Sequence, residues 1–218
     1  METAPAVRPS AMPTGPGPTR VELLVATTNT GKLREIREAL AGPTLEIVTL
    51  ADYADIEPPE EVGSTFAENA RAKALYYSAR TSLLTAAEDS GLEVDALGGA
   101  PGVQSSRFGG AGTPYPQKFQ LLYDALHAAG SIDSPARFVC AVALVQDGRV
   151  VFEARGTIEG QVARTPKGQG GFGYDPIFYY PPYGCTLAEA GERKLAVSHR
   201  ARAFARLKEF LERRPDIG

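Results

Sequence analysis

Residues 86–92 read Ala86-Ala87-Glu88-Asp89-Ser90-Gly91-Leu92, a stretch in which two adjacent carboxylates and a hydroxyl group follow an apolar run. The apolar residues predict a strand over 85–89, and Gly91 predicts a turn directly after the acidic pair. A loop-rich segment should then follow over 91–112, which contains Pro101 and paired glycines. Acidic side chains at the end of a strand are typical of a site that meets a metal ion or a water molecule.

The chain on either side of this stretch predicts alternating strands and helices. Upstream, the patterns indicate strands over 21–27 and 45–50, a helix that begins at Lys32, and a helix over 66–80 with the capping box of Thr65 and Glu68. Downstream, they indicate a helix over 116–129, a hairpin of strands 138–145 and 150–154, a strand over 177–180, and a last helix capped by Ser198. This order predicts an α/β fold with a mixed twisted sheet flanked by helices.

The composition limits the class of protein. A length of 218 residues with 43% hydrophobic content suits one large domain or two closely packed lobes. Residues 1–20 hold five of the 17 prolines and predict a disordered leader before a single domain over 21–214. The net charge of −3 argues against a nucleic-acid-binding protein. We find no apolar run of about 20 residues and no signal peptide, which predicts a cytoplasmic protein without a membrane span.

The turn Thr27-Thr28-Asn29-Thr30-Gly31-Lys32 joins a predicted strand to a predicted helix. Backbone N–H groups and the positive end of the helix dipole at such a junction can hold phosphate oxygens, and Lys32 adds a full charge. The spacing of a Walker loop is absent. The alternative is an ordinary connection in which Asn29 only caps the helix.

Residues 168–173 match the pattern G-x-G-x-x-G, but Asp175-Pro176 and a strand-like run follow where a dinucleotide-binding fold needs a helix. This order excludes a Rossmann site. The segment is then a glycine loop that presents Phe172, Tyr174 and Asp175. The aromatic side chains either pack in the core or meet a ligand.

Three further groups carry charge that a site can use. In the acidic pairs Glu60-Glu61 and Glu88-Asp89, adjacent side chains of an extended chain point to opposite sides, so we expect one member of each pair to face the site. Lys73 follows Phe66 by seven residues, near the apolar face of its helix, where it either snorkels to solvent or points into a cleft. Ser198-His199-Arg200 either caps a basic surface helix or contacts a ligand. The sequence holds no G-x-S-x-G elbow for serine catalysis.

Taken together, the motifs at 27–32, 86–92 and 170–176 resemble those of the noncanonical purine nucleoside triphosphate pyrophosphatases, the HAM1-like inosine triphosphatase family, over about residues 21–211. The resemblance implies two lobes around a central cleft. It also implies that inosine, deoxyinosine and xanthosine triphosphates are hydrolysed between the α- and β-phosphates with Mg²⁺. The resemblance further implies a homodimer that binds a small-molecule purine nucleotide. It implies no binding to nucleic acid or to a membrane.

The resemblance assigns a role to each motif. The triphosphate would meet Lys73 and the turn of Thr27, Thr28, Asn29, Thr30, Gly31 and Lys32. Mg²⁺ would be held by Asp89 with Glu60 or Glu61, and Asp89 would orient or deprotonate the attacking water beside Glu88. The nucleotide would also contact Ser90, Phe172, Gly173, Tyr174, Asp175, Lys194, His199 and Arg200.

Two positions depart from the family pattern, because Thr28 replaces a common glycine and Glu88 replaces a common aspartate. A buried donor facing the 6-keto oxygen would favour inosine over adenosine by about 1–3 kcal/mol. Guanine shares that oxygen, so rejection of GTP needs a second feature. Two other functions stay open: a noncatalytic nucleotide-binding or sensing protein, and a related pyrophosphatase that acts on other nucleotides.

Overall fold

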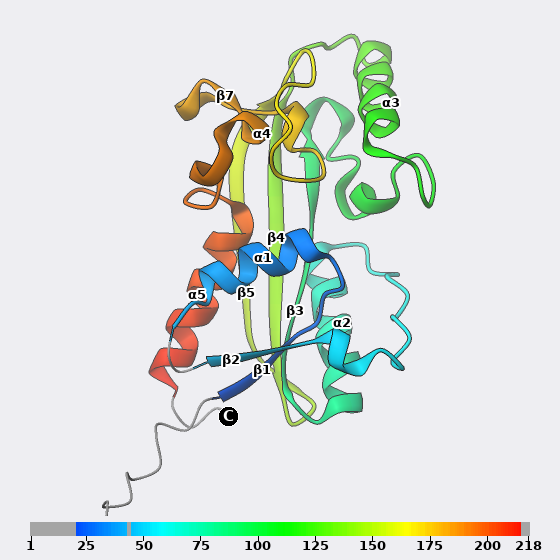
Figure 1. The fold of residues 1–218 in the computed structure, drawn as a ribbon. Coiled ribbons are helices and arrows are strands. Elements are labelled where there is room, and N and C mark those ends of the chain that lie inside the picture. The colour runs from blue at the N-terminus through cyan, green and yellow to red at the C-terminus, as the bar shows by residue number, and fades with distance from the viewer. Residues whose placement is uncertain (1–20, 43–44, 215–218) are drawn as a thin grey trace, which may run out of the picture.

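The computed structural model describes residues 21–42 and 45–214, so the predicted leader over 1–20 lies outside the described residues. Seven strands form one sheet in the order β2-β1-β3-β4-β5-β6-β7, with helices on both faces (Figure 1). The strands are β1 (Val21–Val25), β2 (Leu45–Thr49), β3 (Leu84–Val94), β4 (Pro135–Gln146), β5 (Arg149–Val162), β6 (Phe178–Tyr180) and β7 (Cys185–Thr186). The helices are α1 (Thr30–Ala39), α2 (Phe66–Thr81), α3 (Tyr115–Ala128), α4 (Leu187–Ala190) and α5 (His199–Arg213). Short 3₁₀ turns include η1 (Leu50–Tyr53), η2 (Asp95–Leu97), η3 (Gly102–Arg107), η4 (Asp175–Ile177), η5 (Pro181–Tyr183) and η6 (Gly191–Lys194).

The direction of the strands confirms the predicted mixed sheet. Strand β1 runs parallel to both β2 and β3. The pairs β3–β4, β4–β5, β5–β6 and β6–β7 are antiparallel. The β-loop-α start of the chain thus supplies the parallel part, and the long β4–β5 hairpin supplies the antiparallel part.

The polar signals at the helix starts are also confirmed. Asn29 caps α1 by accepting a hydrogen bond from the N–H of Lys32 at 3.0 Å. At α2, the Thr65 hydroxyl accepts from the N–H of Glu68, and the Glu68 carboxylate accepts from the N–H of Thr65. Ser198 caps α5. None of the helices among the described residues combines the length and the apolar character that crossing a bilayer requires.

Strand β3 differs from its prediction, because it continues past Gly91 to Val94 and stays paired with β4. Gly91 lies opposite Val139 in this ladder. A Cβ atom at Gly91 would overlap the Ser105 hydroxyl and would come within 2.6 Å of the Gly102 carbonyl oxygen. The glycine therefore permits a close approach of η3 to the strand, and the predicted turn at Gly91 is wrong.

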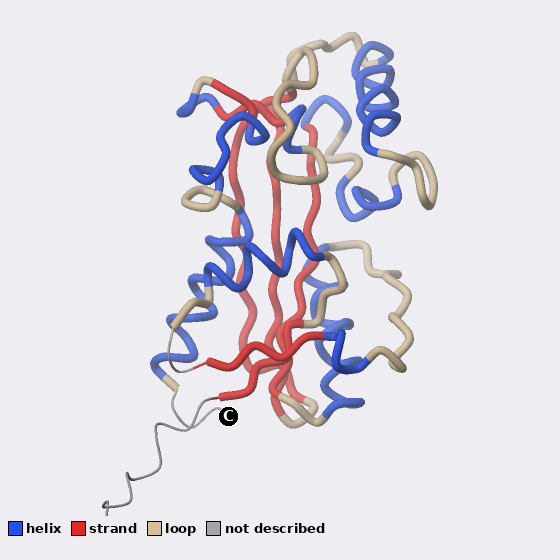
Figure 2. The backbone as a smooth tube through the Cα atoms, in the orientation of Figure 1, coloured by secondary structure: helices blue, strands red, loops and turns tan. Residues whose placement is uncertain are grey.

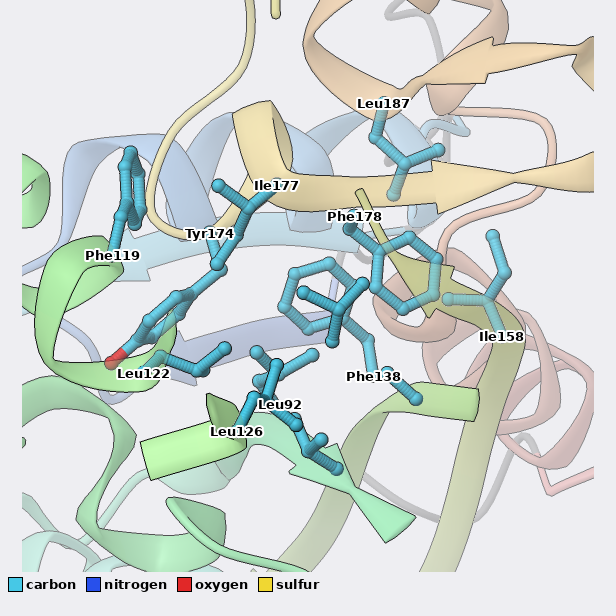
Figure 3. Close-up of a cluster of buried hydrophobic side chains, with 13 residues drawn as sticks. Leu92, Phe119, Leu122, Leu126, Phe138, Ile158, Tyr174, Ile177, Phe178 and Leu187 are labelled. Carbon is cyan, nitrogen blue, oxygen red and sulfur yellow. The ribbon is translucent and has the colours of Figure 1, made fainter. Parts of the chain in front are cut away.

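Three clusters of buried side chains divide the molecule into two lobes. In the lower lobe of Figure 1, one cluster lies between the sheet and helices α1 and α5, and another lies under α2 on the opposite face. The upper lobe has its own cluster, in which Phe138 stacks on Phe178 with ring centroids 4.6 Å apart (Figure 3). Strands β3, β4 and β5 run through both lobes and hold them together (Figure 2).

The unequal lengths of β1 and β3 create an open edge in the middle of the sheet. Strand β1 ends at Val25, which pairs with Ala86. Within the described residues, β3 then has no neighbouring strand on that side until the isolated bridge between Glu93 and Pro101. Side chains from both faces of β3 can reach the space at this edge. It holds Glu88, Asp89 and Ser90.

Candidate active site

Two adjoining cavities lie at this edge, and we name them after their side chains. The lysine cavity has a volume of ≈ 240 Å³ and lies where β1, β3 and α2 meet. Its polar lining consists of Thr27, Thr28, Asn29, Lys32, Glu61, Lys73, Glu88, Asp89, Ser90 and Ser106. The Phe172 cavity has a volume of ≈ 80 Å³ and shares Asn29, Lys32, Ser90 and Ser106 with it. The shared residues place the two cavities side by side.

Lys73 and Asp89 face each other in the lysine cavity. The Lys73 ammonium donates to Glu61 Oε1 at 2.7 Å and lies 3.5 Å from Asp89 Oδ1. Asn69, one turn before Lys73 on α2, donates to Asp89 Oδ2 at 3.0 Å. Lys73 therefore points into the cleft, and the snorkelling alternative is wrong.

Burial and charge act against each other on these groups. Burial raises the pKa of Asp89, and the nearby Lys73 opposes this rise without cancelling it. Burial also favours the neutral form of Glu61, but Lys73 and Arg107 outweigh it and lower the pKa of that carboxyl. Burial alone would lower the pKa of Lys73, whereas the surrounding carboxylates raise it. Asp89 is thus the better proton acceptor, and Lys73 keeps its charge.

Glu88 points to the other face of β3 and is buried. Its Oε1 lies 2.7 Å from Lys32 Nζ and 3.7 Å from Arg200 Nε, and the Cys140 thiol donates to its Oε2 at 3.4 Å. Burial disfavours the charged form, yet Lys32 and Arg200 hold the pKa of Glu88 well below its usual range. We expected only one member of the Glu88-Asp89 pair at the site, and this is wrong because the open edge lets both line the lysine cavity.

In the other acidic pair, only Glu61 faces the site. Glu61 is half-buried and lines the lysine cavity. Glu60 is exposed and does not line it. The expectation of one facing member is therefore confirmed for this pair.

The Phe172 ring lies between the start of α1 and two buried cations. Lys194 Nζ is 4.5 Å from the ring centroid and Arg200 Cζ is 5.5 Å from it. A Cβ atom at Gly31 would come within 2.8 Å of the ring, so the ring packs closely on that backbone. Thr30 and Gly31 thus lie at the first turn of α1 but do not line the lysine cavity. Phe172 itself is half-buried and borders a cavity, which favours contact with a ligand.

The rest of the glycine loop is held by the protein itself. Tyr174 is buried, and its hydroxyl donates to the Ser105 carbonyl oxygen at 3.0 Å, as a core aromatic would. Asp175 accepts from the N–H of Phe172 at 2.8 Å and from Lys194 Nζ at 2.6 Å. Burial raises the pKa of Asp175 although Lys194 opposes it. The residues of this loop that border the Phe172 cavity are Phe172, Gly173, Tyr174 and Asp175.

Glu35 pairs with Lys194 and Arg200, two of the cations that line the Phe172 cavity, a role that was not predicted from the sequence. Its Oε2 accepts from Arg200 Nη1 at 2.7 Å, and its Oε1 lies 2.7 Å from Lys194 Nζ. Burial opposes the charge, but Arg200 and Lys194 outweigh it and lower the pKa of Glu35. Glu35 follows Lys32 by three residues on the same face of α1, and this spacing was the signal available in the sequence.

Ser198, His199 and Arg200 are all buried, so the alternative of a basic surface helix is wrong. The His199 ring stacks on Phe138 with centroids 4.9 Å apart. Its Nδ1 has no hydrogen-bond partner in the described part of the chain. Burial, with the positive charges of Arg200 and Lys194, holds the pKa of His199 well below its ordinary value. The imidazole is therefore neutral.

We expect the neutral His199 to make the protein less stable in mild acid. Between its depressed folded pKa and about 6.5, the unfolded chain binds a proton that the folded chain does not, so the free energy of unfolding falls by up to about 1.4 kcal/mol per pH unit as the pH decreases. Urea unfolding of the wild type and of His199→Gln from about pH 8 to about pH 5 measures this slope. The wild type should lose more stability per pH unit than the variant, and equal slopes would contradict the assignment.

Asn69 and Arg107 were also missed. Asn69 precedes Lys73 by four residues, so both lie on one face of α2, and this spacing could have revealed it. Arg107 donates to Glu61, which is 46 residues away in the chain. No local pattern predicts a pairing over that separation.

A larger hollow of the described structure lies elsewhere. It has a volume of ≈ 860 Å³ and lies beside the start of α2 and the 98–103 turn. Its charged side chains pair with one another at the surface, as Arg71 does with Glu153 at 2.9 Å. We therefore place the candidate active site in the two smaller cavities, where buried charges converge.

A model of the Ham1 family matches residues 23–210. The chain belongs to the Ham1 family. A relative from Thermus thermophilus, named dITP/XTP pyrophosphatase, is 44% identical over 190 residues, which cover 87% of this chain and 91% of the relative. A protein of the same name from Gloeobacter violaceus is 47% identical over 188 residues, which cover 85% of this chain and 91% of the relative.

Solved Ham1 structures have the same fold. The HAM1 protein from Coxiella burnetii matches with a TM-score of 0.82 and 38% identity, covering 88% of this chain and 99% of that one. The Mycobacterium abscessus nucleoside-triphosphatase or dITP/XTP pyrophosphatase matches with a TM-score of 0.69 and 40% identity, covering 86% of this chain and 98% of that one. The family and the fold class predicted from the motifs are confirmed.

Proposed function

We propose that this chain hydrolyses noncanonical purine nucleoside triphosphates, those of inosine, deoxyinosine and xanthosine, to the monophosphate and pyrophosphate. This activity removes such nucleotides from the pool. Relatives that are 44% and 47% identical over most of their length carry the name dITP/XTP pyrophosphatase. The observation that carries the assignment to this cleft is the adjacency of a cavity lined by two lysines and a cavity lined by Phe172 with Lys194 and Arg200.

The lysine cavity suits a triphosphate. Helix α1 begins directly after Thr27, Thr28 and Asn29 of the cavity lining, so the positive end of its dipole lies beside the cavity, a common arrangement for phosphate. Lys32 is held by Glu88, and Lys73 is held by Glu61 and Asp89. Both ammonium groups are thus oriented before a substrate arrives, which reduces the ordering cost of binding.

The carboxylates of this cavity fit a Mg²⁺ ion, to which the nucleotide phosphates would add further ligands. Among the described residues, no three His, Cys, Asp or Glu side chains form a complete metal site. Glu61 and Asp89 nevertheless face one cavity, with Lys73 between them. Proteins often hold Mg²⁺ through one or two carboxylates plus substrate phosphates. Bound in this cavity, the ion would neutralise and polarise the phosphates.

Asp89 is suited to orient and deprotonate the attacking water. Asn69 fixes its Oδ2, while Oδ1 faces Lys73. The raised pKa of Asp89 makes its carboxylate a stronger base than an exposed aspartate. Lys32 and Lys73 would stabilise the negative charge of the transition state and of the leaving pyrophosphate.

The Phe172 cavity supplies both a stacking surface and hydrogen-bond donors for the base. Stacking on Phe172 is tolerant of base identity. Arg200 and Lys194 carry only donors, and donors favour the 6-keto oxygen of hypoxanthine or xanthine over the amino group of adenine by about 1–3 kcal/mol. Selection against ATP follows from this chemistry, and selection against GTP has to be measured.

Initial rates with Mg²⁺ and the triphosphates of inosine, xanthosine, guanosine, adenosine and cytidine, with the products identified, test the proposal. We expect inosine and xanthosine triphosphates to be hydrolysed fastest, with release of pyrophosphate. Binding without turnover would favour the sensing alternative. Faster hydrolysis of a pyrimidine nucleotide would favour a related pyrophosphatase, and release of orthophosphate would show that a different bond is cut.

Lys32→Ala should weaken binding of the phosphate tail. Loss of one charged hydrogen bond, worth about 1.5–3 kcal/mol, corresponds to an affinity for inosine triphosphate that is lower by roughly 10-fold or more. The affinity for inosine monophosphate should change less. Arg34→Ala on the exposed side of the same helix is the matched control. If the relative affinity for the two nucleotides is unchanged in Lys32→Ala, the phosphate assignment is wrong.

We further propose that residues 21–214 act as one domain of two lobes and that the protein works as a homodimer in the cytoplasm, where nucleotide pools are kept. A dimeric mass in sedimentation equilibrium would support this assembly. A monomeric mass at the concentration used for kinetics would exclude the homodimer as the active form.

A further inference from the structure

Arg107 joins the two lobes at the mouth of the lysine cavity. It is the last residue of η3, which follows β3 and precedes α3 in the upper lobe. Its partner, Glu61, lies in the segment between η1 and α2 of the lower lobe. In Figure 1 this segment, drawn in cyan before α2, lies below the green turns that precede α3. The contact therefore crosses between lobes.

The Arg107 guanidinium donates hydrogen bonds to two oxygens of Glu61, one in the side chain and one in the backbone. Its Nη1 donates to Glu61 Oε2 at 3.0 Å, and its Nη2 donates to the Glu61 carbonyl oxygen at 3.0 Å. Its Nε donates to Gln104 of the same turn, which orients the guanidinium. These two simultaneous hydrogen bonds need the planar guanidinium of an arginine, because a lysine ammonium is a single point charge and cannot reproduce their geometry.

Few other hydrogen bonds fix the position of Glu61. Within the described residues, the only hydrogen bonds of the segment 58–62 are those of Glu61 with Arg107 and Lys73. Val62 beside it is 84% exposed. The segment contains Pro58 and Pro59, which lack a backbone N–H. The position of the Glu61 carboxylate in the cavity therefore depends on these two cations.

We propose that Arg107 is a positioning residue that acts through Glu61: from the upper lobe, it holds the Glu61 carboxylate in place for a divalent cation in the lysine cavity. Arg107 does not line that cavity, so it has no direct access to the phosphates there. The inference rests on the proposed function for the role of Glu61. It adds a requirement that both lobes be in contact for the ion to bind.

Arg107→Ala is expected to weaken Mn²⁺ binding to the substrate-free protein by roughly 10-fold or more, as for other residues that orient a metal ligand. Titration followed by electron paramagnetic resonance measures this affinity. Cleavage of the 58–62 segment by a glutamate-specific protease should become faster. Arg107→Lys keeps the positive charge but cannot make both hydrogen bonds to Glu61, so it should behave like Arg107→Ala. Arg71→Ala, which removes a surface arginine paired with Glu153, is the matched control and should change neither quantity.

A double-mutant cycle separates positioning from direct contact. If Arg107 acts through Glu61, Arg107→Ala should lower kcat/KM for inosine triphosphate in the wild type but change it by less than about 2-fold in the Glu61→Gln background. An equal loss in both backgrounds would show that Arg107 meets the substrate itself and would overturn the proposal. Unchanged Mn²⁺ affinity in Arg107→Ala, or full recovery in Arg107→Lys, would overturn it as well. Absence of pyrophosphate release by the wild type would refute the proposed function, and Mn²⁺ binding would still test Arg107.

Discussion

Asp89→Asn is expected to lower kcat for inosine triphosphate by on the order of 10³-fold and to leave binding of the nucleotide measurable. The substitution keeps the size of the side chain and removes its ability to accept a proton. Lys32 and Lys73 stay in place to hold the phosphates, since Lys32 pairs with Glu88 and Lys73 still pairs with Glu61. Binding and turnover should therefore separate in this variant.

Quench-flow measurement of pyrophosphate release and calorimetric titration of the nucleotide give the two quantities. Glu60→Gln is the control, because it removes a neighbouring exposed carboxylate that does not line the lysine cavity. It should keep the wild-type kcat. An Asp89→Asn protein with near-normal kcat would remove Asp89 from the catalytic role.

Glu35→Gln is expected to reduce the free energy of unfolding by about 3 kcal/mol or more. The Glu35 side chain has no exposed surface and pairs with Arg200 and Lys194 at 2.7 Å. Removing its charge leaves two buried cations with less compensation, while burial of Arg200 and Lys194 stays the same. For a protein of this size, the loss corresponds to a decrease in Tm of very roughly 6–12 °C.

Glu38→Gln provides the matched comparison, since Glu38 lies one turn later on the exposed side of α1. Its free energy of unfolding should stay within about 0.5 kcal/mol of the wild type. Urea denaturation of both variants at neutral pH measures the difference. Equal stabilities for the two variants would mean that solvent or structural relaxation compensates the buried cations, and Glu35 would then not be needed to hold them.

Much of the fold was predictable because its signals are local. Asn29, Thr65 and Ser198 each cap a helix through hydrogen bonds to residues within the first turn. A glycine inside a strand misled the prediction, because Gly91 permits close approach of another segment instead of ending the strand. Strand β5 also runs beyond its predicted end at residue 154. A Cβ atom at Gly156 would overlap the backbone at the start of α5, and β5 continues past it to Val162.

The site was predictable only in part, because some of its contacts join residues that are far apart in the sequence. Lys32 could be found because it stands at a helix start, and Asp89 because an acidic pair after an apolar run is conspicuous, although Asp89 lies inside β3 and not at its end. The pairing of Glu35 with Arg200 and that of Arg107 with Glu61 could not be assigned, because 165 and 46 residues separate the partners and only folding brings them together. The alternation of side chains along β3 was read correctly, but the open edge beside Glu88 depends on where β1 ends.

The central claim is that a purine nucleotide spans the two adjoining cavities. A crystal structure of Asp89→Asn with Mg²⁺ and inosine triphosphate tests it most directly. We predict that the phosphates lie between Lys32 and Lys73 and that the base lies against Phe172. A nucleotide bound in the hollow beside α2, or a triphosphate that contacts neither lysine, would contradict this claim.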